Sequence, residues 1–352
     1  MLTRVMMHFQ IPVLITVALI IIIIPSGTIL ITSNNYFSTT NLAYGQTDQT
    51  IFNNTNQINT NNRNSLNIQN IPVKRVHVGD IDIAYRTFDK GDPILLIGGQ
   101  GSKMDSWEPS ILRNLSTNHT VIVFDNRGVG NTTTGTKPFS IQQFANDTTG
   151  LLEALKIQKA DVLGHSLGSF IAQQLAVMHP EKVNRLVLVS ASCGGKESIP
   201  PSPQLLRFAS EMIKNATNNV PISNLRTIMG DSAGSGWMKS HPNAFQNVPE
   251  RANFSEFSPI PLNTLKQQFG VQPAWFGNGV CDKLTSVSSP TLIITGTDDI
   301  NVPAANSLII AGKIPDAWFI HIKDAGHAIM DQYPDKFNKV LETFLSTTTN
   351  PG

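Results

Sequence analysis

Two hydrophobic patterns alternate along the chain from about residue 71 onward. Short continuous apolar runs, typical of strands buried on both faces of a parallel sheet, occupy residues 93–97, 120–124 and 290–295. Further strands are predicted where Val162 and Leu163 lead into Gly164 and at residues 185–189 and 318–322. Segments with helical spacing of apolar residues lie between and after them, at residues 107–115, 140–155, 169–178, 302–313 and 334–345. This alternation predicts an α/β fold, with a mostly parallel central sheet and helices on both faces.

Two further segments depart from the parallel-sheet pattern. Residues 73–78 and 81–87 alternate apolar and polar positions about Gly79-Asp80, which predicts an antiparallel hairpin at a sheet edge. Residues 194–284 lose the alternation, begin near a proline-rich stretch and contain scattered aromatics. We interpret residues 194–284 as an inserted helical cap over the strand ends, and residues 71–193 and 285–352 as the core. The cap aromatics either line an acyl or ring pocket or pack within the cap.

The first 70 residues have a different composition. Arg4 and His8 precede a run, residues 11–24, whose only polar side chain is Thr16. Residues 1–32 are therefore predicted to be a signal peptide, cleaved after the small-residue site at residues 43–45, or an uncleaved N-terminal membrane anchor. Either one predicts an exported protein, secreted or held on the outer face of the cell membrane. Residues 33–70 are rich in Asn, Thr, Gln and Ser, which predicts a disordered linker.

Composition limits the classes of partner and cofactor. The chain has 352 residues and a formal net charge of +1, so no basic surface for nucleic acid is indicated, and membrane contact is expected only through the N-terminal segment. The histidines lack metal-binding spacing, and no phosphate loop or dinucleotide fingerprint occurs, so we expect no cofactor. The only cysteines, Cys193 and Cys281, lie near the two ends of the cap and form either a disulfide or two buried thiols.

One motif contains a candidate catalytic residue. Residues 164–168, GHSLG, form a G-x-S-x-G pattern between a predicted strand and a predicted helix. A sharp turn there exposes the hydroxyl of Ser166, and it leaves no room for side chains at Gly164 and Gly168. The Leu167 N–H, at the helix start, would then face the oxyanion of an acyl-transfer reaction. The alternative is a glycine-flanked serine that caps a helix.

A serine nucleophile needs a base and a carboxylate that orients the base. Asp298 and Asp299 follow the strand predicted at residues 290–295, and His327 follows the last strand. The order Ser, Asp, His is the one that a nucleophile elbow on this kind of sheet requires. Each candidate follows the end of a strand, so the three loops are expected to converge.

From about residue 71 to the C-terminus, the chain resembles the α/β-hydrolase superfamily, and within it the cap-bearing serine esterases and lactonases. The motifs that carry the resemblance are GHSLGSFIAQQLAVMHPEKVNRLVLVSA, DNRGVGNT, TGTDDINVP and AGHAIM. The resemblance implies an α/β-hydrolase fold with Ser166 as nucleophile and His327 as general acid and base. The family pattern G-x-x-D-x-x-V-P selects Asp299 rather than Asp298. It also assigns the second oxyanion N–H to Gln100, although Gly98 stands where the family usually has histidine.

These features predict a serine hydrolase that cleaves a small carboxylic ester or lactone through an acyl-enzyme. The closest alternative is an aminopeptidase of the proline-iminopeptidase type, which would need an acidic cap residue for the substrate amine. Four glutamates of the cap are candidates: Glu197, Glu211, Glu250 and Glu256. An alternative of another class is a non-catalytic, surface-tethered binding protein that keeps the fold without turnover.

Overall fold

A computed structural model of the full chain describes residues 68–201, 203, 206–207, 230, 232–244 and 261–347. The chain divides into two units, Met1–Arg63 and Asn64–Gly352, and every described residue belongs to the second. The predicted signal or anchor segment, and nearly all of the predicted linker, therefore lie outside the described residues. Within the described part, no helix is both long enough and apolar enough to cross a membrane.

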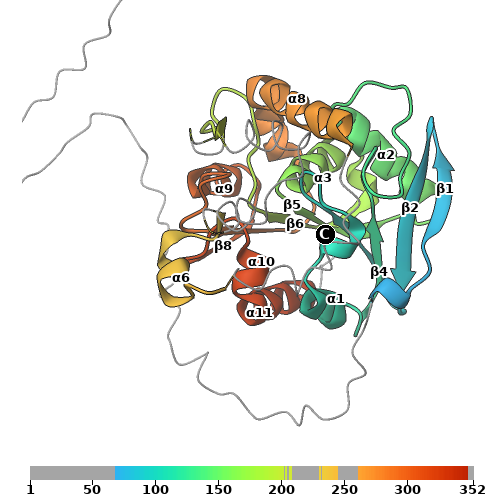
Figure 1. Ribbon diagram of the computed structural model, residues 1–352. Coiled ribbons are helices and arrows are strands. Elements are labelled where there is room, and N and C mark those ends of the chain that lie inside the picture. Colours follow the sequence, from blue (N-terminus) through green and yellow to red (C-terminus); the bar gives the residue numbers. More distant parts are fainter. Residues whose placement is uncertain are drawn as a thin grey trace, which may run out of the picture. The chain divides into compact units, whose positions relative to one another are not determined.

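A mostly parallel sheet organises the second unit (Figure 1). Its eight strands lie in the order β1-β2-β4-β3-β5-β6-β7-β8. The strands are β1 (Lys74–Val78), β2 (Ile81–Phe88), β3 (Asp92–Ile97), β4 (His119–Phe124), β5 (Ala160–His165), β6 (Val183–Val189), β7 (Thr291–Gly296) and β8 (Trp318–Ile322). β2 runs antiparallel to both β1 and β4, whereas the pairs from β4 to β8 are parallel. The predicted edge hairpin and parallel sheet are both confirmed.

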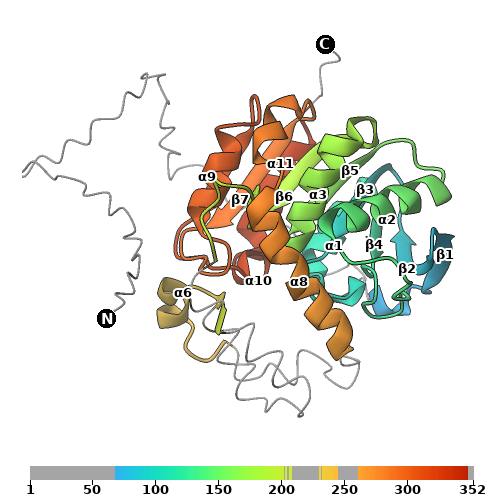
Figure 2. The same ribbon diagram turned by 90° about the horizontal axis from the view of Figure 1, so that it is seen from above.

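Helices cover both faces of the sheet, as predicted (Figures 1 and 2). The helices that pack on one face are α2 (Ile141–Ala154), α3 (Leu167–Met178) and α9 (Ala304–Ala311). Those on the other face are α1 (Pro109–Leu115), α10 (Ile329–Gln332) and α11 (Pro334–Leu345). Short 3₁₀ turns occur at Ile68–Asn70, Met104–Ser106, Pro180–Lys182 and Cys281–Ser286.

The continuous apolar runs are explained by this layering. Successive side chains of a strand point to opposite faces. In β3, Leu95 and Ile97 belong to the core beneath α2 and α3, whereas Ile94 and Leu96 belong to the core beneath α1 and α11. All four are 0% exposed, so residues 94–97 are buried on both faces and all are apolar.

Local chemistry sets the helix boundaries. The Ser140 hydroxyl accepts the Gln143 N–H at 3.0 Å, so Ser140 caps α2. α1 begins at Pro109, later than the sequence predicted, because proline suits the first helical turn and the Glu108 side chain caps it. α9 begins after Pro303 rather than at Val302, since a residue that precedes proline disfavours the helical conformation.

The register brings the carboxyl ends of the central strands to one level. Ile97 of β3 pairs with Gly164 of β5, Gly164 pairs with Leu188 of β6, and Leu188 pairs with Ile293 of β7. The loops that follow these strands therefore emerge side by side, where ligand sites of open parallel sheets form.

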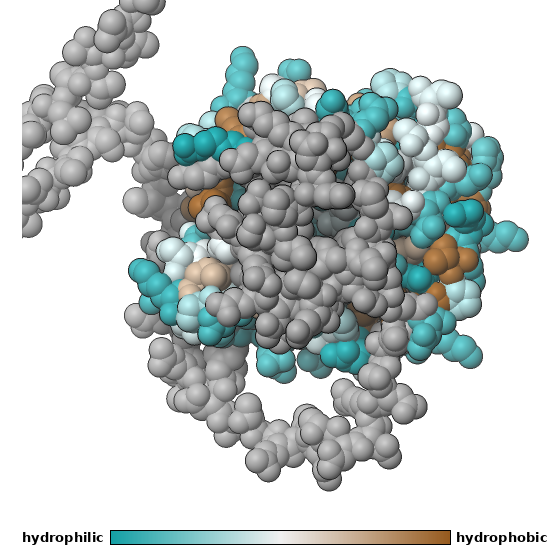
Figure 3. Space-filling model, viewed as in Figure 1, coloured by the Kyte–Doolittle hydropathy of each residue, from teal (hydrophilic) through white to brown (hydrophobic). Residues whose placement is uncertain are grey.

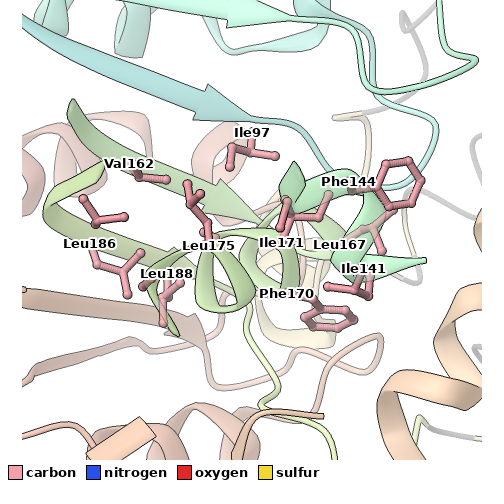
Figure 4. Close-up of a cluster of buried hydrophobic side chains, with 14 of the residues drawn as sticks. Ile97, Ile141, Phe144, Val162, Leu167, Phe170, Ile171, Leu175, Leu186 and Leu188 are labelled. Carbon is pink, nitrogen blue, oxygen red and sulfur yellow. The ribbon is translucent and has the colours of Figure 1, made fainter. Parts of the chain in front are cut away.

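The core beneath α3 holds the end of β5 rigidly (Figure 4). Leu167, Phe170, Ile171 and Leu175 of α3 are at most 3% exposed and belong to the same buried cluster as side chains of the sheet. The sheet residues that they meet are Ile97, Val162, Leu186 and Leu188. Close packing on both sides of Ser166 thus fixes the position of its backbone.

The described parts of the predicted cap include α6 (Ser235–Ser240) and α8 (Leu262–Asn278). Trp275 of α8 stacks on Phe170 of α3, with ring centroids 5.3 Å apart, and donates its indole N–H to the Ser192 carbonyl at 3.1 Å. Among the cap aromatics, Trp237 and Trp275 are buried, whereas Phe245, Phe254 and Phe257 lie outside the described residues. Trp275 therefore serves as packing between α8 and the core.

Cys193 and Cys281 form a disulfide. Cys193 follows β6, and Cys281 begins the 3₁₀ turn after α8, so the bond closes the two ends of the predicted cap. The Val280 N–H donates to the Cys193 carbonyl at 2.8 Å beside it. Of the two alternatives that the sequence left open, the structure has the disulfide.

The described surface in Figure 3 is mostly hydrophilic, and its hydrophobic residues form small patches. The large apolar side chains exposed over the described part are Val73, Ile199, Leu206, Leu308 and Trp318.

Candidate active site

Ser166 forms the whole connection between β5 and α3. Its backbone has φ 54° and ψ −121°, a conformation that non-glycine residues rarely adopt and that costs free energy. A Cβ on Gly164 would clash with the Gly168 carbonyl, and one on Gly168 would clash with the Ile97 carbonyl. The two glycines of the motif are thus required by close backbone approach, as the sequence predicted.

The structure brings Ser166, His327 and Asp299 into one hydrogen-bonded chain. The Ser166 hydroxyl lies 2.9 Å from Nε2 of His327, and Nδ1 of His327 lies 2.9 Å from Oδ2 of Asp299. An ionised carboxylate only accepts, so Nδ1 carries the proton, and Nε2 is left to accept the serine hydroxyl. This is the geometry of a nucleophile, a base and an orienting carboxylate.

The surroundings of Asp299 keep its carboxyl group ionised. Its side chain has no exposed surface, and its Oδ1 accepts the backbone N–H groups of Asn301 and Val302, each at 2.9 Å. Burial by itself would raise the pKa of Asp299. The adjacent His327 ring and the Val302 N–H outweigh that effect and hold the pKa below its ordinary value.

His165 supports the loop that carries His327. Desolvation lowers the pKa of His165 to about 3, and the nearby His327 ring adds to the shift. The ring is therefore neutral, and its Nε2–H donates to the His327 carbonyl at 3.2 Å. On the other side, the His327 N–H donates to the Ser232 carbonyl at 2.6 Å. His165 thus has a positioning role.

The two predicted oxyanion donors lie on either side of Ser166. Leu167 is the first residue of α3, where backbone N–H groups lack helical partners. Gln100 follows Gly99, where an added Cβ would lie 3.2 Å from the Ser166 Cβ. Among the described residues, no carbonyl accepts the N–H of Gln100 or of Leu167. Both groups remain available to an oxygen that develops negative charge.

The loop of residues 98–101, here called the β3 loop, is held without the histidine that the family usually places at position 98. The Asn126 side chain donates to the Gly98 carbonyl at 3.2 Å, and the Ser102 N–H donates to the Gly99 carbonyl at 3.2 Å. From α8, the Gln268 Oε1 accepts the Gly101 N–H at 2.8 Å. Asn126 and Gln268 were not predicted from the sequence; the signal for Gln268 was a polar position repeated every four residues, at 264, 268 and 272.

The loop after β4 has a structural role. Arg127 is buried and forms ion pairs with Asp80 at 2.8 Å and Asp147 at 2.7 Å. Asp125 accepts the N–H groups of Met104 at 2.7 Å and Asn131 at 2.8 Å, and burial raises its pKa. These contacts fix the backbone beside Asn126.

Within the described residues, no three His, Cys, Asp or Glu side chains are arranged to hold a metal ion.

Comparison with known proteins places this geometry in a family. The sequence profile of the alpha/beta hydrolase fold matches residues 92–334, and the chain belongs to that family. A protein of Azorhizobium caulinodans that is named as a candidate carbamate hydrolase, RutD, is 29% identical over 76% of this chain and 96% of its own length. The poly(3-hydroxyalkanoate) depolymerase of Ectopseudomonas oleovorans is 28% identical over 72% of this chain and 84% of its own.

Solved structures share the fold. Est816, described as an N-acyl homoserine lactone degrading enzyme, superposes with a TM-score of 0.60 at 26% identity, over 77% of this chain and 100% of its own. An enol-lactonase from Burkholderia xenovorans LB400 superposes with a TM-score of 0.63 at 20% identity, over 78% of this chain and 100% of its own.

Proposed function

We propose that this protein is a cofactor-free serine hydrolase that cleaves small carboxylic esters or lactones. One observation carries the proposal: an unbroken chain from the Ser166 hydroxyl through His327 to the ionised Asp299, with distances of 2.9 Å at both links. The hydrogen-bonded chain ends at a strained elbow, beside two backbone N–H donors that no carbonyl of the described residues accepts, as acyl transfer requires.

In the proposed reaction, the Ser166 oxygen attacks the carbonyl carbon while Nε2 of His327 takes its proton. The N–H groups of Leu167 and Gln100 donate to the resulting oxyanion. His327 then protonates the leaving alcohol, and an acyl group remains on Ser166. Water, activated by His327 in the same way, releases the acid. Asp299 keeps Nδ1 protonated and stabilises the imidazolium that forms twice in the cycle.

The likenesses to a lactone-degrading enzyme and to a polyester depolymerase support an ester or lactone as substrate. The aminopeptidase alternative gains no support from the described residues. Of the four glutamates considered for binding a substrate amine, only Glu197 is described, and it pairs with Lys313 at 2.8 Å. The intact hydrogen-bonded chain also argues against a binding protein without turnover.

The first test uses the full-length protein in mild detergent, with p-nitrophenyl esters of graded acyl length and a set of lactones. We expect turnover that Ser166→Ala abolishes and covalent labelling of Ser166 by a fluorophosphonate. Turnover of carbamates or N-terminal peptides but of no ester or lactone would show that the bond class is wrong. A protein that neither turns over substrate nor reacts with the fluorophosphonate would refute the hydrolase.

We also propose that the protein is exported and reaches the membrane only through residues 1–32. The disulfide between Cys193 and Cys281 supports export, since disulfides persist mainly in oxidising compartments. Activity should be found in the medium or on the outer side of the membrane fraction, and removal of residues 1–32 should retain it in the cytosol. Cytosolic activity of the full chain would contradict this proposal.

A further inference from the structure

The side chain of Gln268 on α8 has a hydrogen-bond donor with no partner. The residue is 0% exposed, and its Oε1 accepts the Gly101 N–H at 2.8 Å. A backbone N–H only donates, so this bond fixes which end of the amide faces Gly101. The Nε2 group is left buried without an acceptor among the described residues. Such groups are rare because burial without a hydrogen bond costs free energy, and an unpaired donor next to a reactive centre points to a ligand.

This donor lies next to the candidate oxyanion site. Gly101 follows Gln100, whose backbone N–H is the predicted second oxyanion donor, so Gln268 contacts the β3 loop at the residue next to that donor. The Gln100 side chain behaves in the same way. Its Oε1 accepts from Gln272 Nε2 at 2.6 Å, and its own Nε2 is buried without a partner.

The α8 helix brings this polar group to the strand ends. Positions four residues apart share one helical face, and Thr264, Gln268 and Gln272 are spaced in that way. Thr264 is 1% exposed and faces Gly128 of the loop after β4. α8 also packs on the core through apolar side chains such as Val271 and Trp275. The buried polar side chains of Thr264 and Gln268 on the same helix are not explained by that apolar packing.

We propose that the amide groups of Gln268 and Gln100 form a subsite for a second acceptor oxygen of the substrate, a carbonyl or ether oxygen close to the scissile ester. Both donors are uncharged amides, which suit a neutral acceptor. A site with buried donors discriminates strongly against an analogue that lacks the matching oxygen, because the donors then stay unpaired. The inference rests on the proposed hydrolase function and specifies its substrate class as oxygen-bearing esters.

The test compares two matched pairs of esters that differ only by oxygen in place of a methylene. On the acyl side the pair is p-nitrophenyl methoxyacetate and p-nitrophenyl butyrate. On the alcohol side it is 2-methoxyethyl butyrate and butyl butyrate, followed by titration of the released acid. For each pair, the ratio of kcat/KM values measures the preference for the second oxygen, and comparison between variants cancels the intrinsic reactivity of the esters.

Two variants remove the donor. Gln268→Glu keeps an oxygen for the Gly101 N–H but has no Nε2, and Gln268→Met removes both functions at similar size. The control is Gln267→Met, at the adjacent position of the same helix. In at least one ester pair, we expect both Gln268 variants to lower the ratio by about 10- to 100-fold. The control should leave it within about threefold, and thermal unfolding checks that each variant is folded.

The outcomes separate this inference from the proposed function. If the wild type hydrolyses the plain esters but the ratios are equal in wild type and variants, the subsite is wrong and the hydrolase stands. If the Gln268 variants slow all four esters equally, Gln268 only holds the β3 loop, and the subsite is again wrong. If the wild type hydrolyses no ester and does not react with a fluorophosphonate, the proposed function itself fails.

Discussion

Asp298 and Asp299 are adjacent carboxylates with different surroundings. Asp299 is buried and bonded to His327, whereas Asp298 accepts the Ser235 hydroxyl and the Gly236 N–H, each at 3.3 Å, beside α6. The backbone turn after β7 thus points the Asp299 carboxylate toward His327 and the Asp298 carboxylate toward α6. The pair provides an internal control for the role proposed for Asp299.

We expect Asp299→Asn to lower kcat by about 10⁴-fold, because a neutral amide neither fixes the His327 tautomer nor stabilises the imidazolium. Asp298→Asn keeps the size of the side chain, leaves His327 untouched, and should retain kcat within about threefold. Steady-state kinetics on a p-nitrophenyl ester measure both. Equal losses in the two variants would show that Asp299 has no special part in the reaction.

The lowered pKa of His165 leads to a separate prediction about how the stability of the protein depends on pH. Its folded-state pKa is about 3, and its unfolded pKa is about 6.5. Between these values the unfolded chain binds a proton that the folded chain does not. Stability therefore falls as the pH drops below about 6.5. From pH 7 to pH 5.5, the wild type should lose about 1 kcal/mol more unfolding free energy than His165→Gln, whose amide can still donate to the His327 carbonyl. Urea unfolding at both pH values measures this, and parallel losses would contradict it.

At the scale of elements, the elbow depends on contact between two backbones. β5 and α3 approach so closely that Gly168 lies against the Ile97 carbonyl of β3. A side chain at position 168 would therefore displace either α3 or the end of β3, and the β3 loop follows directly from that end. The strain at Ser166 persists because the packing of α3 on the sheet holds it.

Gly168→Ala should therefore lower the free energy of unfolding by about 3 kcal/mol and abolish ester turnover. Gly270→Ala is the control, because Gly270 lies inside α8 with nothing within 4 Å of an added Cβ. Alanine there should stabilise the protein by about 0.5–1 kcal/mol. Thermal and urea unfolding measure both variants; a stable, active Gly168→Ala would refute the close-approach argument.

At the scale of the molecule, the disulfide ties the two ends of the predicted cap to the core. Cys193 and Cys281 are separated by 88 positions in sequence, so the bond closes a long loop in the unfolded chain. In the chain-entropy account, long loops gain the most from such a restriction. The predicted cap includes Gln268, which contacts the β3 loop, so the attachment of this segment also bears on the candidate active site.

Replacing both cysteines with serine should lower the free energy of unfolding by about 2–4 kcal/mol. Dithiothreitol should produce a similar loss in the wild type and none in the double variant, which serves as the control for other effects of the reductant. Urea unfolding with and without reductant makes the measurement. A wild type that is insensitive to reduction, with accessible thiols confirmed by alkylation, would show that the bond adds no stability.

The sequence by itself determined the architecture, and the motifs that it shares with the α/β-hydrolase family selected the three residues of the hydrogen-bonded chain, Asp299 rather than Asp298 among them. Apolar runs such as residues 93–97 admit few alternatives, because only a strand buried on both faces needs every position apolar. The sharp turn at Ser166 could also be predicted from the sequence, since glycine is required where backbones approach closely. Ser166, Asp299 and His327 each follow a strand end, and the order of a parallel sheet brings such ends together.

Only the tertiary structure decided how the β3 loop is held and what faces the reactive serine. Asn126 reaches Gly98 because β4 lies beside β3 in the sheet, whereas the contacts of Gln268 and Gln100 depend on where α8 crosses the strand ends. The pairing of Cys193 with Cys281 depended in the same way on the path of the chain through the cap. A periodic pattern reports which face of an element is buried, but polar contacts between distant segments are set by the packing that brings them together.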